Sequence, residues 1–318
     1  MFKMLAIALN TFREAVRNRI LYIILIFALL LLVFSGVLKN FTIADDARII
    51  QNFGMSAINF FGLLISIFIG ITLIYNEMEK KTLYTIVSKP IDRGQFLLGK
   101  YFGLLLTIYA NVLIMALFFL IALNWQKLTE SDFIQNAIYT FDQASQQYVQ
   151  TMSLPVYYLR AAGKSVVLAV ATFLNLSTPE YATGLMATTW LTCLELAVIT
   201  AFACMYSTFS TPTLSAIFTL LTVIIGRLST DIYYFAQMMA QRKGSYEALD
   251  QAEKIWYQTA IGVFYIVPNL TLFNRRASVI YPDHEPMDFM AYTVGYGLCY
   301  SAAVLCLAIL VFRKRNFK

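Results

Sequence analysis

The stretch that decides the fold is EMEKKTLYTIVSKPIDRGQFLLGKYFG, residues 77–103, a charged segment between two strongly apolar runs. Leu83 and Ile86 are three residues apart, and this spacing predicts an apolar stripe on an otherwise polar short helix. Pro90 disfavours helical geometry at the residue before it, so this helix is expected to end near Ser88.

A second helix is expected to begin at Arg93. Asp92 and Gln95 have the spacing of a capping box, and Ile91 and Phe96 fit the hydrophobic staple that accompanies it. Two helices with a corner between them, held at a membrane surface, form a structure that a soluble partner could push. The alternative is an ordinary solvated turn.

The composition identifies an integral membrane protein. Of the 318 residues, 59% are hydrophobic and 13% are charged, whereas soluble domains carry roughly 25% charged residues. Six apolar runs reach the roughly 20 residues that a bilayer core requires. The sequence therefore predicts an all-α protein with one membrane domain and six spans, at Ile20–Leu38, Met55–Tyr75, Tyr101–Leu123, Leu185–Thr208, Leu214–Ala236 and Met290–Phe312.

The distribution of charge orients these spans. With both termini in the cytosol, the inside segments carry a net charge of +9 and the rest of the chain carries −3. An excess of basic residues in cytoplasmic loops is the usual pattern. We therefore expect cytosolic termini, a cytosolic loop at 76–100, and two long extracytoplasmic segments, at 124–184 and 237–289.

Several shorter segments are expected to lie along the membrane surface. Residues 2–16 have helical apolar spacing, which predicts an amphipathic helix in the interface before the first span; the alternatives are a cytosolic extension of that span and a cleaved signal peptide. Ser131–Met152 and Tyr246–Val267 are predicted amphipathic outer helices. Val166–Leu176 and Ile255–Val267 are too short to span, so they are interpreted as interfacial or re-entrant.

The sequence lacks the residues of several enzyme classes. The four cysteines lie in apolar runs without metal-like spacing, and there is one histidine, His284. Gly94–Lys100 matches most of a phosphate-binding loop, but Tyr101 replaces the required serine or threonine and an apolar span follows. Gly163-Lys164-Ser165 also fails, because Tyr158 occupies the first glycine position. We therefore expect a non-enzymatic chain without a bound cofactor or metal.

Three charged residues fall inside the predicted spans. Glu195 lies about midway along the fourth span and Arg227 at a similar depth in the fifth, with Asp231 one turn farther out. An unpaired charge at the centre of a span costs roughly 2.5–3.5 kcal/mol, so such groups pair or face a wet cavity. A Glu195–Arg227 pair is predicted, together with an i, i+4 pair between Arg227 and Asp231. The cluster either lines a pathway or a contact between subunits, or is a structural salt bridge.

The motifs of residues 77–103 resemble the first cytosolic loop of type-2 ABC exporter permeases, whose pattern runs roughly E-x-G/K/R-T-L, S-x-P, R and G-K. Here the matching residues are Glu79-Lys80-Lys81-Thr82-Leu83, Ser88-Lys89-Pro90, Arg93 and Gly99-Lys100. FREAVRNRILYIIL near the start and FRKRNF at the end are also similar to this family. Within it, the chain looks closest to the permease of the nitrous-oxide-reductase maturation system. It departs from the family's common pattern in the length of 124–184 and in having Lys81 where many members have glycine.

The resemblance implies the partners. Members have a connecting helix, six spans and a cytosolic coupling helix, and two permease chains face each other, each on a cytosolic ATPase that binds ATP and Mg²⁺. The second chain is either another copy or a paralogue. The ATPase-contact residues implied here are Glu77, Glu79, Lys80, Lys81, Thr82, Leu83, Ser88, Pro90 and Arg93. No nucleic acid is expected.

The resemblance also implies the function. We expect a permease in a prokaryotic inner membrane that couples ATP hydrolysis by its partner to export or extrusion of a substrate. The alternative is a non-transporting membrane scaffold that acts mechanically on an extracytoplasmic partner protein. A secondary transporter is disfavoured, because repeated halves and broken helices at the midplane are not evident.

Overall fold

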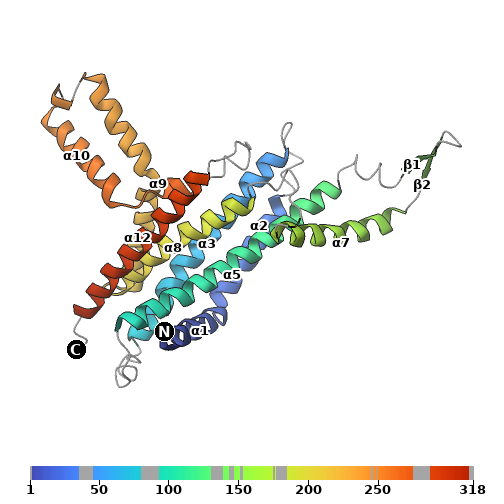
Figure 1. Ribbon diagram of the computed structural model, residues 1–318, viewed down its shortest axis with the longest axis horizontal. Helices are drawn as coiled ribbons and strands as arrows, with labels where there is room; N and C mark the ends of the chain where they lie inside the picture. Colours follow the sequence, from blue (N-terminus) through green and yellow to red (C-terminus); the bar gives the residue numbers. More distant parts are fainter. Residues whose placement is uncertain are drawn as a thin grey trace.

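Long helices make up almost all of the structure, a computed structural model that describes residues 2–35, 46–79, 93–129, 139–142, 147–150, 153–174, 176, 185–244, 246–248, 250–274 and 287–314 (Figure 1). The α-helices are α1 (Phe2–Val16), α2 (Arg19–Ser35), α3 (Asp46–Glu79), α5 (Arg93–Leu128), α7 (Leu154–Phe173), α8 (Leu185–Ser207), α9 (Pro212–Arg242), α10 (Gln251–Ile266) and α12 (Met287–Lys314). Two short 3₁₀ helices, η3 (Tyr246–Ala248) and η4 (Leu270–Phe273), and two short strands, β1 (Tyr139–Asp142) and β2 (Gln147–Gln150), complete the described elements. The predicted all-α membrane class is confirmed.

Among the described residues, six helices are long and apolar enough to cross a membrane: α3, α5, α7, α8, α9 and α12. The pair α1 and α2, bent by 64°, gives a seventh if it is counted as one span. The sequence predicted α2 in place of α7. The described part of α2 has 17 residues, which is at the lower limit for a span.

The direction of the chain decides whether α7 crosses the bundle alone. Gly54 and Gly62 of α3 lie against Phe119 and Val112 of α5, so α3 and α5 run antiparallel. Because α3 runs parallel to α8, α5 and α8 are also antiparallel. The end of α5 and the start of α8 therefore lie on the same side. Since a single crossing between them would put them on opposite sides, α7 is not an independent span.

Both termini lie at one end of the bundle (Figure 1). Helix α1 packs against the first turns of α5, where Gly99 approaches Ile7. The C-terminal end of α12 lies beside Arg93, at the start of the same helix. Helix α3 runs parallel to α8, because Asn59 contacts Glu195 and Ser66 contacts Thr200, so α3 also ends here.

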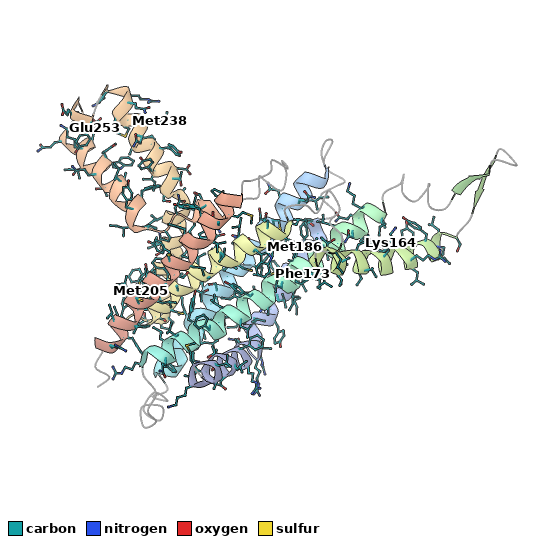
Figure 2. The ribbon with its side chains drawn as sticks, viewed as in Figure 1. Lys164, Phe173, Met186, Met205, Met238 and Glu253 are labelled. Atoms are coloured by element: carbon teal, nitrogen blue, oxygen red, sulfur yellow. The ribbon has the colours of Figure 1, made fainter. Side chains whose placement is uncertain are left out.

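Helix α8 is the centre of the bundle, in contact with α3, α5, α9 and α12. Most of its side chains are buried, as expected for a helix that is apolar on all sides and surrounded by others. Beyond this bundle, α7 and the α9–α10 hairpin extend away from the end that holds the termini, and Figure 2 marks them with Lys164 on α7 and Glu253 on α10. Helix α7 rests on the last turns of α5, where Asn124 donates to the Ser165 carbonyl at 3.4 Å.

The outer segment at 131–152 differs from its prediction. A helix was expected, with Phe141 and Tyr148 on one face, but β1 and β2 form an antiparallel hairpin in which these two residues are directly opposite each other. Aromatic and β-branched residues favour strands, and such cross-strand pairs stabilise them. The apolar spacing fitted both structures, and the helix prediction was wrong over the described part of this segment.

The predicted helix at Tyr246–Val267 is confirmed, but it begins at Gln251. Asp250 and Glu253 form a capping box, which fixes this start. Lys243, at the end of α9, donates to Glu253 at 2.6 Å. This hydrogen bond lowers the pKa of Glu253, helped by the backbone N–H of Asp250, and raises the pKa of Lys243. The ion pair therefore joins the two arms of the α9–α10 hairpin across the neutral pH range.

Candidate functional site

The predicted coupling residues lie at the end of the bundle that holds the termini. Glu77 and Glu79 belong to the last turn of α3, and their side chains lie outside the described residues. Lys80, Lys81, Thr82, Leu83, Ser88 and Pro90 also lie outside the described residues. The helix expected to start at Arg93 is confirmed as α5.

Arg93 ties the start of α5 to the end of α12. Its Nη1 atom donates to the carbonyls of Phe312 and Arg313, at 3.5 and 3.4 Å. These are among the last carbonyls of α12, where a cation is favoured by the helix dipole. Phe96 stacks on Phe312 one turn along, with ring centroids 6.4 Å apart. Arg93 therefore has a structural role within the chain, in addition to the ATPase contact that the resemblance implies for it.

Two glycines let α1 approach the same part of α5. A Cβ atom on Gly99 would lie 2.8 Å from Ile7, and one on Gly103 would lie 2.5 Å from the backbone oxygen of Ala8. Small residues spaced four apart allow helices in membranes to pack closely. Between them, the buried Lys100 pairs with Glu14 of α1, Nζ to Oε2, at 3.5 Å.

This packing explains two features of the sequence. Gly99 and Lys100, which fit part of a phosphate-binding loop, lie in the second turn of the helix α5 and contact α1. On α1, the residues in contact with the two glycines of α5 include Ile7, Ala8 and Thr11, whereas Leu5 and Leu9 of the predicted apolar stripe are exposed. The apolar stripe of α1 is therefore left for the membrane interface, as an amphipathic helix requires.

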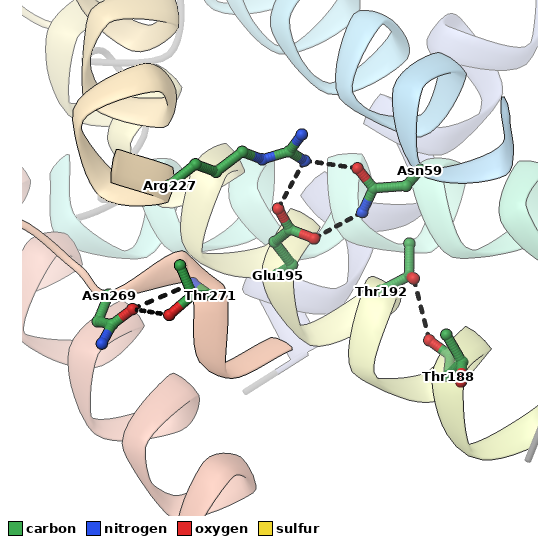
Figure 3. A network of polar contacts seen from close by, with 7 residues as sticks. All are labelled: Asn59, Thr188, Thr192, Glu195, Arg227, Asn269 and Thr271. Carbon is green, nitrogen blue, oxygen red and sulfur yellow. Dashed lines mark hydrogen bonds and ion pairs between the residues drawn. The ribbon is translucent and has the colours of Figure 1, made fainter. Parts of the chain in front are cut away.

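The predicted pair between Glu195 and Arg227 is present and includes a third residue, Asn59 of α3 (Figure 3). Arg227 Nη2 lies 2.8 Å from Glu195 Oε1 and donates to Asn59 Oδ1 at 2.5 Å. Asn59 Nδ2 donates to Glu195 Oε2 at 2.5 Å. The three side chains thus form a closed triangle that joins α3, α8 and α9.

This triangle is at mid-depth in the bundle. Glu195 is the eleventh of the 23 residues of α8, and Asn59 is the tenth of the 24 residues of the apolar stretch Ile50–Leu73 in α3. The side chain of Glu195 is 2% exposed, whereas that of Arg227 is 40% exposed. The carboxylate is therefore fully desolvated and depends on its two partners.

Neighbouring contacts position α9 for this pair. A Cβ on Gly226 would lie 2.7 Å from the backbone oxygen of Pro268, so the absence of a side chain allows the chain before η4 to pack closely here. The Thr230 hydroxyl donates to Asn269 Oδ1 at 3.2 Å, which ties the next turn of α9 to η4. Asn269 in turn accepts from the backbone N–H of Thr271 (Figure 3). Arg227 is thus held between two anchored residues.

The sequence missed Asn59 and misplaced Asp231. Asn59 carries no charge, so a search for charged residues in apolar runs does not find it, although an amide in the middle of a span was a usable signal. Asp231 is exposed, and the described residues give it no ion pair with Arg227. The predicted i, i+4 pair was therefore wrong.

Comparison with known proteins gives the family. The family model described as ABC-2 family transporter protein matches residues 5–316, almost the whole chain. The chain belongs to this family. No curated protein matches it closely enough to add a relative. The ABC-2 family protein described here is a multi-pass membrane permease, whose membrane-crossing helices surround the Glu195–Arg227–Asn59 triangle.

The described residues contain no group of three or more His, Cys, Asp or Glu side chains that could hold a metal ion. The triangle balances one negative against one positive charge, so it joins three helices without a net charge. An arrangement of this kind can stabilise one packing of the spans, and breaking it can release another.

Proposed function

We propose that the chain is the membrane subunit of an ATP-driven exporter, which couples ATP hydrolysis by a separate cytosolic ATPase to movement of a substrate across the inner membrane. The observation that supports this most is the gathering of α1, the end of α3, the start of α5 and the end of α12 at one end of the bundle. The segment with the coupling motifs, 80–92, joins two of these helix ends.

The proposed mechanism is a rigid-body transmission. ATP and Mg²⁺ bind to the partner, and closure of two ATPase subunits pushes the coupling segment. The start of α5 receives this push first, and Arg93, Lys100 and Gly103 join it to α12 and α1. Since packed helices move as units between discrete arrangements, the spans are expected to rock together.

The proposed orientation rests on the charge of the end of the bundle that holds the termini. This end carries the excess of basic residues, which favours the cytosolic side. In this orientation the termini and the coupling segment face the ATPase, and α7 and the α9–α10 hairpin lie on the extracytoplasmic side. As part of this proposal, we place the chain nearest to the branch of the nitrous-oxide-reductase maturation permease within its family. This placement rests on the sequence motifs.

Leu83→Asp is expected to reduce recovery of the ATPase. Leu83 is on the apolar stripe of the predicted coupling helix, and loss of a central apolar anchor lowers affinity at least about tenfold. Tagged chain is extracted in detergent, and mass spectrometry measures the co-purifying P-loop ATPase. Lys164→Asp, an exposed change on α7 at the other end of the bundle, is the matched control and is expected to retain it.

Two results would contradict the proposal. If the unchanged, folded chain recovers no P-loop ATPase, ATP coupling is wrong and the scaffold function is favoured. If Leu83→Asp recovers as much ATPase as Lys164→Asp, the coupling segment is not the contact. The unfolding temperatures of both variants show whether a loss reflects misfolding.

One observation favours the alternative, a scaffold that pulls on an extracytoplasmic protein. Helix α7 leaves the bundle from the last turn of α5 and carries the β1–β2 hairpin away from it (Figure 1). Such an arm has no evident use in forming a pathway, but it can bind a protein outside.

Replacing residues 131–152 with a short Gly/Ser linker separates the two functions. If the chain is a scaffold, the deletion abolishes binding of the extracytoplasmic partner, measured by cross-linking in intact cells. Binding of the ATPase and ATP hydrolysis are expected to persist, since both depend on the opposite end of the bundle. Unchanged transport by the deletion variant would instead support the exporter.

A further inference from the structure

An apolar groove runs between α2 and α3 at the surface of the bundle, and we call it the α2–α3 groove. Its volume of about 480 Å³ is within the range of roughly 300–1,000 Å³ that is usual for ligand sites. Phe27 meets the buried Phe61 edge to face, with ring centroids 5.8 Å apart, and this contact joins the two walls. The other side chains that line the groove include Ile23, Ile26, Leu30, Phe60 and Leu64. Since all of these side chains are apolar, the groove suits a hydrocarbon chain.

The α2–α3 groove lies in one half of the membrane. Phe27, which contacts Phe61, is about 12 Å along α2 from Arg19. Phe61 is about 3 Å along α3 from Asn59, a member of the mid-depth triangle. Because α2 starts at the end of the bundle that holds the termini and α3 runs toward it, Arg19 is about 15 Å from mid-depth, roughly half the thickness of the hydrocarbon core. The groove therefore spans the acyl chains of one leaflet, and Arg19 is at the level of the headgroups of that leaflet.

Arg19 places a positive charge at the end of the groove nearest the termini. It is the first residue of α2 and precedes Ile23 by four residues, so both lie on the same face of the helix. Its side chain is exposed, and so is that of Arg17 in the preceding corner. The nearby carboxylate of Glu14 pairs with Lys100, and among the described residues neither arginine has an ion pair. A guanidinium in this position is well suited to bind a phosphate group.

We propose that the α2–α3 groove binds a membrane phospholipid with an anionic headgroup, with one acyl chain in the groove and the phosphate bound to Arg19. An acyl chain extends from the headgroups to the middle of the bilayer, and the groove extends from the level of Arg19 to that of Asn59. Basic residues at the end of a span favour anionic lipids. The bound chain contacts α2 and α3 together and stabilises the packing of α2 on α3. This inference concerns the chain by itself and does not depend on the proposed coupling to ATP hydrolysis.

Photolabelling of the purified full chain tests this site. The probe is phosphatidylglycerol with a diazirine in the middle of one acyl chain, and mass spectrometry of peptides locates the label. We expect label at residues 23–30 and 60–64, lost on addition of excess unlabelled phosphatidylglycerol but retained with phosphatidylcholine of the same acyl chains. Leu298 and Leu307 of α12 are as exposed as the groove residues but do not line the groove. Label at these two positions is expected to respond equally to the two lipids.

Matched variants test the headgroup and the acyl chain separately, and native mass spectrometry measures the bound lipid. Arg19→Gln is expected to weaken phosphatidylglycerol binding about fivefold, the contribution of one basic residue near an anionic membrane surface. Lys164→Gln, an exposed change on α7, is expected to leave binding unchanged. Leu30→Trp fills one end of the groove and is expected to abolish the label, whereas Leu307→Trp retains it. The unfolding temperature of each variant shows that it is folded.

Three results would overturn the site. If both lipids displace the label in the groove and on α12 equally, the groove holds only bulk lipid. If Arg19→Gln and Lys164→Gln bind phosphatidylglycerol equally well, Arg19 does not bind the headgroup. If the groove takes no label in native membranes and a cysteine at Ile26 cross-links two differently tagged copies, a second chain covers the groove. Recovery of the ATPase is measured in separate samples, so failure of the lipid site and failure of the proposed function are distinguishable.

Discussion

Arg227→Ala is expected to destabilise the bundle by about 3–5 kcal/mol, since removing one partner of a buried ion pair leaves an uncompensated charge. The charge left behind is the carboxylate of Glu195, which is 2% exposed at mid-depth in α8. Asn59 alone would then satisfy it, through one hydrogen bond. The temperature of unfolding in detergent, followed by intrinsic fluorescence, measures the loss.

Matched variants separate charge from packing. Glu195→Gln keeps an acceptor for Arg227 and buries no charge, so it is expected to cost much less. The double variant Arg227→Met and Glu195→Met replaces the pair with apolar side chains of similar size, and such replacements are often neutral or stabilising. If Arg227→Ala and the double variant destabilise equally, the cost comes from lost packing and the buried charge is not its cause.

The same variants test whether the pair has a role in transport. If the triangle only stabilises the fold, Glu195→Gln retains both assembly and substrate-dependent ATP hydrolysis in the complex. If it controls the switch between arrangements of the spans, assembly is retained and substrate dependence is lost. The two readouts are measured on the same purified complex.

Hydropathy predicted the position of most helices but not their ends. The span expected at 101–123 is the central part of α5, which runs from Arg93 to Leu128. A hydropathy window detects the length in contact with lipid, whereas a helix ends where capping or tertiary contacts end it. Capping signals located the start of α5 at Arg93 from the sequence alone, and Pro212 similarly occupies the first turn of α9.

The site was predicted where charge was the signal and missed where size or hydrogen bonding was. Glu195 and Arg227 stand out in apolar runs, and they pair at 2.8 Å. Asn59 and the small face of α1 have no such signal, because their role depends on which helices become neighbours. Asp231 was predicted to pair with Arg227 by spacing along one helix, yet tertiary contacts with α3 and α8 bind the guanidinium instead.

Gly103→Ala is expected to displace α1 from α5. The added Cβ would lie 2.5 Å from the backbone oxygen of Ala8 and 2.6 Å from Cβ of Thr11, and a backbone atom cannot rotate away as a side chain can. Overpacking of this kind costs about 1–3 kcal/mol, and Gly103→Val is expected to cost more. A cysteine at Ala8, which is buried against Gly103, becomes accessible to a maleimide reagent when α1 lifts away.

Gly262→Ala is the control for this change. Gly262 lies within α10 and a Cβ there would meet nothing within 4 Å, so alanine is expected to stabilise the helix by about 0.5–1 kcal/mol. Opposite signs for the same substitution in two helices would establish that close approach of α1, and not helix propensity, requires glycine at 103.

If α1 stays docked in Gly103→Ala, the contact adapts and the push proposed for α5 has another route. If α1 lifts while the ATPase still co-purifies and hydrolyses ATP without moving substrate, then α1 and α5 must move as one unit for the push to reach the spans.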